Sequence, residues 1–154
     1  MPIVIATGTN LGNRKVNLQK AKEILSSHFQ FLEESRIYES PAVDYLQQPD
    51  FYNQVLVFKT PDLPAEKVMS LLLEVEKLMG RTREVLRGPR IIDLDLLFFD
   101  FIHHNSDHLT LPHPRLFERS FVVLPLQELQ IYNELEKHFH FTNKFDNTAT
   151  PLAE

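Results

Sequence analysis

In the second half of the chain lies the stretch Pro89-Arg90-Ile91-Ile92-Asp93-Leu94-Asp95-Leu96-Leu97-Phe98-Phe99. Its Ile, Leu and Phe content predicts a β-strand, although aspartate is disfavoured in strands. Because side chains alternate along a strand, Asp93 and Asp95 share one face, and Leu94 lies on the other with its apolar neighbours. The strand is therefore expected to bury one face and to present two carboxylates together on the opposite face.

The two carboxylates allow two interpretations. Neighbouring carboxylates raise each other's pKa unless a cation lies between them, and paired hard oxygen ligands suit Mg²⁺ that also holds substrate phosphates. The alternative is a pair of solvated acids on the open face of an edge strand. From the residues alone, Asp93 and Asp95 are candidate metal ligands and both readings stay open.

A cluster of arginines precedes this strand. Arg81, Arg83, Arg87 and Arg90 lie in or beside the loop that leads into it, with Glu84 as the only acid among them. The planar guanidinium pairs with two phosphate oxygens at once and keeps its charge, which suits a clamp for a polyphosphate. A solvated basic loop is the alternative, and the adjacent acids favour the clamp.

Composition limits the classes of function. The 154 residues, 43% of them hydrophobic, are predicted to form a single domain spanning 1–154, with a peripheral tail over about 133–154. The sequence contains no cysteine, which excludes disulfides and thiolate chemistry. The N-terminus lacks the pattern of a signal peptide, so a cytoplasmic location is expected. The net charge of -5 argues against binding to nucleic acid or to an anionic membrane.

The remaining segments predict the fold. Extended segments are expected near residues 3–7, 31–38 and 51–58, and helical spacing of apolar residues follows Asn13 and Pro64, the second helix ending at Gly80. The order βαββαβ is that of an α+β ferredoxin-like sandwich, in which two helices cover one face of four antiparallel strands. The tail is expected to be peripheral, or disordered beyond about Asn143.

Two other motifs carry little chemical information. The segment Gly8-Thr9-Asn10-Leu11-Gly12 follows a strand but lacks the spacing and the lysine of a phosphate-binding P-loop, so a strand-to-helix turn is expected. Three histidines, His103, His104 and His108, are irregularly spaced in a turn-rich stretch, and we expect them to be solvated rather than metal ligands.

With its flanks, the segment 87–97 resembles the signature of the 6-hydroxymethyl-7,8-dihydropterin pyrophosphokinase family of the folate pathway. Three further stretches agree with that family in order and separation. They are Ala6-Thr7-Gly8-Thr9-Asn10-Leu11-Gly12, Gln48-Pro49-Asp50-Phe51-Tyr52-Asn53, and Leu111-Pro112-His113-Pro114-Arg115 with Arg119, Phe121 and Pro125-Leu126. The resemblance covers residues 3 to about 129.

The resemblance implies a monomeric ferredoxin-like enzyme that transfers diphosphate from ATP to 6-hydroxymethyl-7,8-dihydropterin and releases AMP. It implies that Asp93 and Asp95 hold two Mg²⁺ ions, and that these acids work with Arg81, Arg83 and Arg90 in catalysis. The implied partners are ATP and the pterin, with neither nucleic acid nor membrane involved.

The resemblance also assigns binding residues. For the pterin they are Ser40, Pro41, Ala42, Val43, Phe51, Asn53 and Phe121, with the two phenylalanines on either side of the ring and Asn53 on its polar edge. For ATP they are Glu76, Arg83, Arg90, Leu109, Thr110, His113 and Arg119. Without the resemblance, Phe51 and Phe121 would be read as ordinary core aromatics.

Two functions of other classes remain open at this point. The element order alone would suit a non-catalytic ferredoxin-like ligand-binding or regulatory module. Paired carboxylates would also suit two-metal phosphoryl chemistry on nucleic acid, although the net charge of -5 and the lack of a basic, aromatic-lined groove count against it.

Overall fold

The computed structural model describes residues 1–42, 47–81 and 90–153, and the assigned Val43 and Arg83 lie outside these ranges. No helix in the described ranges is both long and apolar enough to cross a membrane. The elements are β1 Pro2–Thr9, α1 Arg14–His28, β2 Phe31–Glu34, β3 Tyr38–Ser40, β4 Phe51–Lys59, α2 Ala65–Leu78, β5 Asp93–Phe99, β6 His104–Asn105, β7 Thr110–Leu111, a 3-10 turn Leu116–Glu118, α3 Ser120–Gln127, α4 Tyr132–His138 and β8 Thr150–Pro151.

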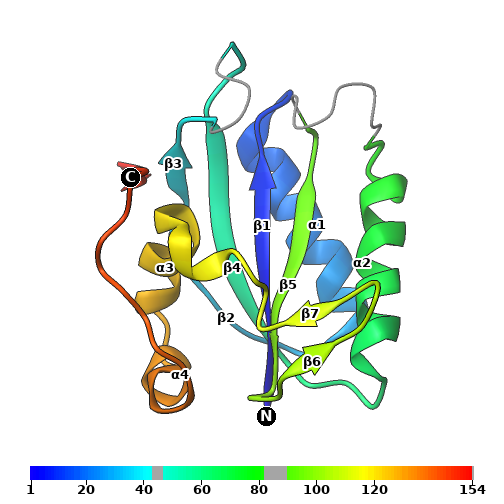
Figure 1. Ribbon diagram of the computed structural model, residues 1–154. Coiled ribbons are helices and arrows are strands. Elements are labelled where there is room, and N and C mark those ends of the chain that lie inside the picture. Colours follow the sequence, from blue (N-terminus) through cyan, green and yellow to red (C-terminus); the bar gives the residue numbers. More distant parts are fainter. Residues whose placement is uncertain (43–46, 82–89, 154) are drawn as a thin grey trace.

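The main sheet is antiparallel, with the strand order β5-β1-β4-β3-β8 and with β2 paired to β4 (Figure 1). The predicted ferredoxin-like α+β fold is confirmed. The extended segment expected over residues 31–38 is two strands, β2 and β3. Between them the Ser35 N–H still donates to the Val55 carbonyl at 3.0 Å, but the Val55 N–H donates to Ser35 Oγ at 3.0 Å, so a side chain replaces one backbone bond of the ladder.

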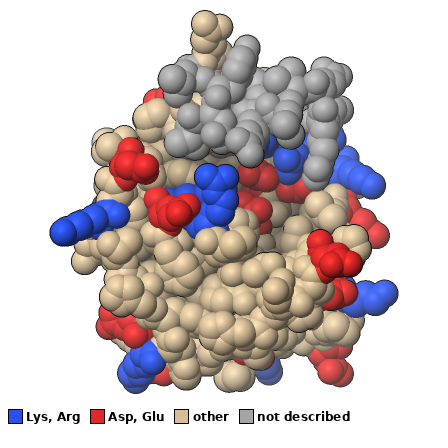
Figure 2. Space-filling model, viewed as in Figure 1, with Lys and Arg blue, Asp and Glu red and all other residues tan. Residues whose placement is uncertain are grey.

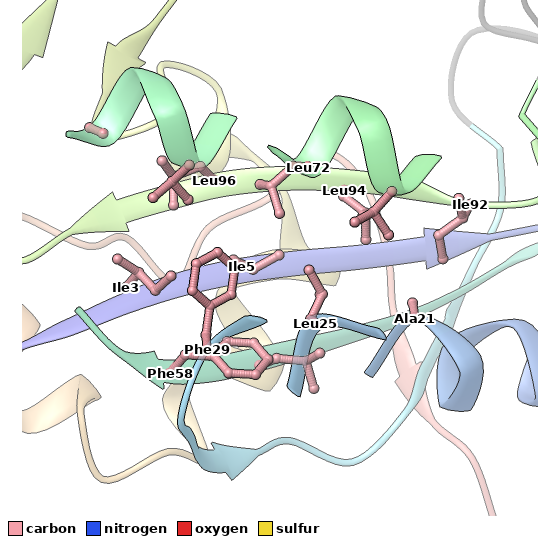
Figure 3. Close-up of a cluster of buried hydrophobic side chains, with 14 of the residues drawn as sticks. Ile3, Ile5, Ala21, Leu25, Phe29, Phe58, Leu72, Ile92, Leu94 and Leu96 are labelled. Carbon is pink, nitrogen blue, oxygen red and sulfur yellow. The ribbon is translucent and has the colours of Figure 1, made fainter. Parts of the chain in front are cut away.

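One face of the sheet packs against α1 and α2 (Figure 3). Ile3 and Ile5 of β1 and Leu94 of β5 meet Leu25 of α1 and Leu72 of α2 in a continuous apolar cluster. Both helix boundaries have local causes. Asn13 caps α1 by accepting the Val16 N–H at 3.2 Å, and Gly80, with φ of +92°, follows the end of α2 as predicted.

A second layer covers part of the other face, which corrects the expectation of helices on one face only. Val4, Val57 and Leu97 of the sheet pack against Leu126 of α3 and Leu135 of α4. These short helices lie at the opposite side of the sheet from α1 and α2 (Figure 1). They leave the upper part of this face uncovered by a helix, where the C-terminal end of β1 and the N-terminal ends of β4 and β5 meet.

The tail, which was expected to be peripheral or disordered beyond about Asn143, makes defined contacts over its described residues. Phe139 and Phe141 pack in the second apolar cluster, which is the one between the sheet and the helices α3 and α4. The chain then runs beside α3 to β3 (Figure 1). There, Thr150 pairs with Glu39 in an antiparallel bridge. This segment is held by aromatic contacts and by sheet pairing, and the composition of the tail does not reveal either of them.

Leu72→Ala tests the first apolar cluster. Leu72 is 0% exposed, whereas its neighbour Leu73 is 38% exposed on the same helix. We expect Leu72→Ala to lower the free energy of unfolding by about 2–5 kcal/mol through lost burial and a residual cavity. Leu73→Ala, the matched control, should change it by less than about 1 kcal/mol. Urea denaturation of both variants measures the difference, and equal losses would contradict the packing described.

Candidate active site

The candidate site lies on the sheet face that α3 only partly covers. On this face β1 carries Val4, Ala6 and then Gly8, so its side chains become smaller toward its C-terminal end. The strand registers place Gly8 between Asp93 of β5 and Asn53 of β4. A Cβ at Gly8 would lie 3.4 Å from Asn53 Oδ1, so the glycine keeps space open between the acid and the amide.

A pocket occupies this space and brings most of the predicted site residues together. Its lining combines carboxylates, cations, two phenylalanines and an asparagine from β3, β4, β5, α3 and the loop that follows β7. The residues are Ala6, Thr7, Gly8, Ser40, Pro41, Phe51, Asn53, Gln54, Arg90, Asp93, Asp95, His113, Arg115, Arg119, Phe121 and Val122. The predicted shared face of Asp93 and Asp95 is confirmed, and it opens onto this pocket.

Asp93 is held by arginines at the rim. Arg81 donates to Asp93 Oδ1 at 2.9 Å, and Arg90 lies 3.7 Å from Oδ2. Arg81 also donates to Glu76 Oε2 at 2.7 Å, and the same oxygen accepts the Leu94 N–H at 2.7 Å. Burial raises the pKa of Glu76, although these donors oppose the rise. The buried Glu76 thus orients Arg81 and anchors β5.

Asp95 lies at the floor of the pocket with weaker partners. Arg119 is 4.0 Å from its Oδ2, and His113 Nε2 is 3.9 Å from its Oδ1. Burial, followed by the charge of Asp93, raises the pKa of Asp95 to about 7. The ionised carboxylate is therefore destabilised in this chain, and a cation beside it would relieve that cost.

His113 is neutral at pH 7, because burial and then the charge of Arg119 lower its pKa to about 4. The Arg115 N–H donates to His113 Nδ1 at 3.3 Å. That bond makes Nδ1 the acceptor and assigns the ring proton to Nε2, which faces Asp95. His113 therefore offers one hydrogen-bond donor to the pocket without adding a charge.

The side of the pocket away from the acids combines an amide with two aromatic rings. Asn53 Nδ2 donates to Ser40 Oγ at 2.8 Å and to the Tyr38 carbonyl at 3.2 Å, so the amide is fixed with its oxygen toward Gly8. Phe51 and Phe121 are half-buried and line the pocket, which is not the full burial expected of core aromatics.

A second hollow adjoins the first. Leu109 and Thr110 line it with Met69 and Pro114, and Asp95 and His113 border both hollows. Leu109, Thr110 and His113 of the predicted nucleotide residues line this second hollow, whereas Arg90 and Arg119 line the first pocket with the described pterin residues. His103 and His108 are exposed as expected, whereas His104 is half-buried and bonds to Glu66 at 3.1 Å.

Three assigned residues that the structure describes line neither hollow. Ala42 is buried, and Glu76 and Arg81 lie behind Asp93 as its support. Val43 and Arg83, outside the described residues, are not placed. Figure 2 shows acidic and basic side chains meeting in the hollow at the centre of this face, above a largely uncharged lower half.

Sequence reasoning missed three contributors. Gly8 and Arg115 line the pocket, and the buried Asn10 joins the loops beside it. Asn10 Oδ1 accepts the Arg90 N–H at 2.8 Å, while Asn10 Nδ2 donates to Gln48 Oε1 at 2.8 Å and to the Pro49 carbonyl at 3.0 Å. The position of Asn10, directly after a strand and at the start of a turn, was the sequence signal that could have indicated its role.

The donor set fits magnesium that is shared with phosphates. Within residues 1–42, 47–81 and 90–153, no group of three or more His, Cys, Asp or Glu side chains could hold a metal ion. The pocket offers two carboxylates, and Mg²⁺ is commonly bound by one or two carboxylates plus phosphate and water oxygens. Asp93 and Asp95 are thus suited to an ion that arrives with a polyphosphate.

Asp95→Asn should stabilise the metal-free protein in a pH-dependent way. The pKa of Asp95 rises from its ordinary 3.8 to about 7, so the folded state binds more protons than the unfolded state between these values. Stability contributed by the protonated form is fully present below about pH 4 and is lost as the pH rises through 7. We expect a gain on the order of 1–3 kcal/mol at pH 8 and little at pH 4.

Thermal unfolding in chelator at both pH values measures this gain, with the exposed Asp62→Asn as the matched control. A gain of equal size at pH 4 and pH 8, or a gain in the control, would contradict the assignment to Asp95.

Comparison with known proteins shows the family of this chain. The model of the 7,8-dihydro-6-hydroxymethylpterin-pyrophosphokinase family matches residues 4–131. The 2-amino-4-hydroxy-6-hydroxymethyldihydropteridine pyrophosphokinase of Bacillus subtilis is 40% identical over 127 residues, which are 81% of this chain and 75% of that protein. A mitochondrial folate synthesis bifunctional protein of Arabidopsis thaliana is 37% identical over 142 residues, covering 90% of this chain and 26% of the relative.

Other relatives, including those of known structure, are much longer than this chain, so the match covers only part of each. The folic acid synthesis protein of Pneumocystis carinii is 39% identical over 128 residues, but the match spans only 17% of it. The HPPK-DHPS structure of Plasmodium falciparum with pteroate has a TM-score of 0.63 at 15% identity, covering 88% of this chain and 42% of that one, and supports the fold. By its sequence from residue 4 to 131, the chain belongs to the 7,8-dihydro-6-hydroxymethylpterin-pyrophosphokinase family.

Proposed function

We propose that this pocket transfers the diphosphate of ATP to the hydroxymethyl group of 6-hydroxymethyl-7,8-dihydropterin, with Asp93 and Asp95 as the ligands of two Mg²⁺ ions. The observation that carries the proposal is the position of Asp95. It borders both an amide-and-aromatic pocket suited to a flat heterocycle and a second hollow lined by Leu109 and Thr110. A polyphosphate reaching from the second hollow into the first would pass the acids and the arginines.

The reaction requires alignment and charge neutralisation more than it requires a strong base. The pterin hydroxyl oxygen forms a bond to the β-phosphorus, the bond from that phosphorus to the α,β-bridging oxygen breaks, and AMP leaves. The hydroxyl proton passes to solvent. Arg81, Arg90 and Arg119 surround the acids and supply positive charge where the phosphate oxygens become more negative.

Magnesium, when bound by Asp93 and Asp95, neutralises phosphate charge and lowers the electron density at the β-phosphorus. The side chains around it do the orienting. Neutral His113 directs its Nε2 proton toward the same space, so it can donate to a phosphate oxygen without repelling the metal. Arg81, held by the buried Glu76, keeps one cation fixed beside Asp93.

Stacking and one amide would select the pterin. The ring would lie between Phe51 and Phe121, and aromatic faces hold a flat heterocycle by offset stacking. The oriented Asn53 amide would accept a hydrogen bond from the polar edge of the ring. One chain supplies the acids, cations, aromatic rings and amide that the proposed reaction needs, so we propose that it works as a monomeric, single catalytic domain.

Product analysis tests the proposed reaction. The purified chain with ATP, Mg²⁺ and 6-hydroxymethyl-7,8-dihydropterin should form AMP, and the AMP should depend on the pterin. Chromatography of the nucleotides identifies the product. Formation of ADP would indicate single-phosphate transfer, and absence of turnover by folded protein would favour a ligand-binding module; either result would refute diphosphate transfer.

Asp95→Ala tests the proposed metal ligand. Loss of half of the carboxylate pair should lower turnover at least a hundredfold, since even changes to residues that support metal ligands cost about 10–100-fold. Asp62→Ala, an exposed carboxylate on the loop before α2, should leave turnover unchanged. Steady-state AMP formation across a Mg²⁺ titration measures both, and near-normal turnover of Asp95→Ala would exclude a metal-binding role.

Asn53→Ala tests pterin selection. The pterin edge would lose its partner and stay partly desolvated, so KM for the pterin should rise by about 10–100-fold. KM for ATP should stay within about twofold, because Asn53 lies on the far side of Gly8 from the acids. The exposed Asn133→Ala serves as the control. Equal changes in both KM values would contradict the assigned side of the pocket.

A further inference from the structure

Asn147 of the tail forms hydrogen bonds with the wall of the pocket. Its Oδ1 accepts the Ser120 N–H at 2.7 Å and the Ser120 hydroxyl at 2.5 Å, and its Nδ2 donates to the Glu118 carbonyl at 2.8 Å. A further bond joins Nδ2 to Asp146 Oδ1 at 3.0 Å. Asn147 is therefore bonded on both sides of Arg119, at the start of α3.

These bonds replace a missing helix cap. The first turn of a helix leaves backbone N–H groups without partners, and the residue before the helix commonly accepts one of them through a short polar side chain. Arg119 occupies that position in α3 and makes no capping hydrogen bond. Asn147, distant in sequence, accepts the first N–H of the helix instead, and Ser120 beneath it is 1% exposed.

The capped turn carries two residues of the pocket. Arg119 and Phe121 flank Ser120 in sequence, and both line the cavity that contains Asp95. Arg119 lies 4.0 Å from Asp95 Oδ2, and its guanidinium carbon lies 5.8 Å from the centre of the Phe121 ring. A shift of this turn would therefore move one cation and one aromatic face of the pocket together.

The tail that supplies Asn147 is held at both of its ends. On one side, Phe139 and Phe141 pack in the second apolar cluster with Phe98. On the other side, Thr150 pairs with Glu39 of β3, and the Leu152 N–H donates to the Ile37 carbonyl at 2.9 Å. Asn147 thus lies in the middle of an anchored strap that joins α4, α3 and β3 (Figure 1).

We propose that Asn147 is a positioning residue for the pocket: it caps α3 and so fixes Phe121 and Arg119 against the pterin side. The residue lies beyond positions 4–131, where the chain matches its family, so the assignment comes from the contacts of this structure. The effect of Asn147 on pterin binding rests on the proposed function, whereas its capping of α3 is independent of that function.

The chain offers a matched control for this role. Asn143 is also a tail asparagine bonded to α3, but it accepts from Gln127 Nε2 at 2.9 Å, at the opposite end of the helix from the pocket. Asn143→Ala and Asn147→Ala therefore each remove a bond between the tail and α3. Only Asn147→Ala frees the turn that carries Phe121.

The experiment compares steady-state kinetics of full-length Asn147→Ala, Asn147→Asp and Asn143→Ala well below their melting temperatures. Asn147→Ala should raise KM for the pterin about five- to tenfold, the range expected for loss of a helix cap. Asn147→Asp keeps the acceptor for Ser120 but loses the donor to the Glu118 carbonyl, so its KM for the pterin should rise less than that of Asn147→Ala. Asn143→Ala should leave KM for the pterin unchanged, even if its melting temperature falls.

Amide hydrogen exchange supplies a readout that needs no substrate. Exchange at Ser120 and Phe121 should accelerate about tenfold in Asn147→Ala and not in Asn143→Ala. Unchanged exchange, or unchanged KM for the pterin in an active Asn147→Ala enzyme, would overturn the positioning role and leave the proposed reaction intact. Absence of AMP formation by the original chain would instead refute the reaction, and exchange alone would then decide the role of Asn147.

Discussion

The hydrogen-bonded position of β1, with β5 on one side and β4 on the other, places the two acids and the asparagine of the site. Its two registers bring Asp93, Gly8 and Asn53 into one row across the sheet. A register slip of one residue would turn Asp93 and Asp95 into the apolar layer under α2 and would expose Leu94. Burial of Ile3, Ile5 and Leu94 against the two long helices therefore keeps the acids on the opposite face.

The same row explains why the pocket exists at all. Where β1 carries Val4, the sheet face is filled by α3 and α4; where it carries Gly8, there is neither a side chain nor a helix to fill it. The apolar layer and the pocket are thus two ends of one surface. The packing that stabilises the lower end sets the position of α3, which contributes Phe121 to the upper end.

Prediction from the sequence succeeded where the signal was local. The alternation around Asp93 and Asp95, the spacing of apolar residues in α2 and the glycine after it each act within a few residues, and the structure has all three. The departures depend on distant partners. Ser35 breaks a strand because it meets Val55, and the tail is ordered because Phe139 and Phe141 meet Phe98.

For the site itself, the residue types were predictable, but the support behind them was not. Arg81 reads as a cation for phosphate, yet no pattern in the sequence reveals that Glu76 holds it from below. The start of α3 is similar, because a cap supplied from the tail leaves no mark beside Arg119.

Asp95 illustrates how stability and chemistry compete in this pocket. Burial that raises the pKa of Asp95 to about 7 works against folding at neutral pH, and a well-packed apolar residue would remove that cost. A carboxylate beside a second acid, with Arg119 at 4.0 Å rather than in a short ion pair and with a neutral histidine at 3.9 Å, retains unsatisfied charge. The negative charge of Asp95 would attract a metal–phosphate complex only because the protein's own cations do not fully neutralise it. Under the proposed function, the arrangement around Asp95 is less stable than an apolar one would be, and a bound metal–phosphate complex would offset that cost.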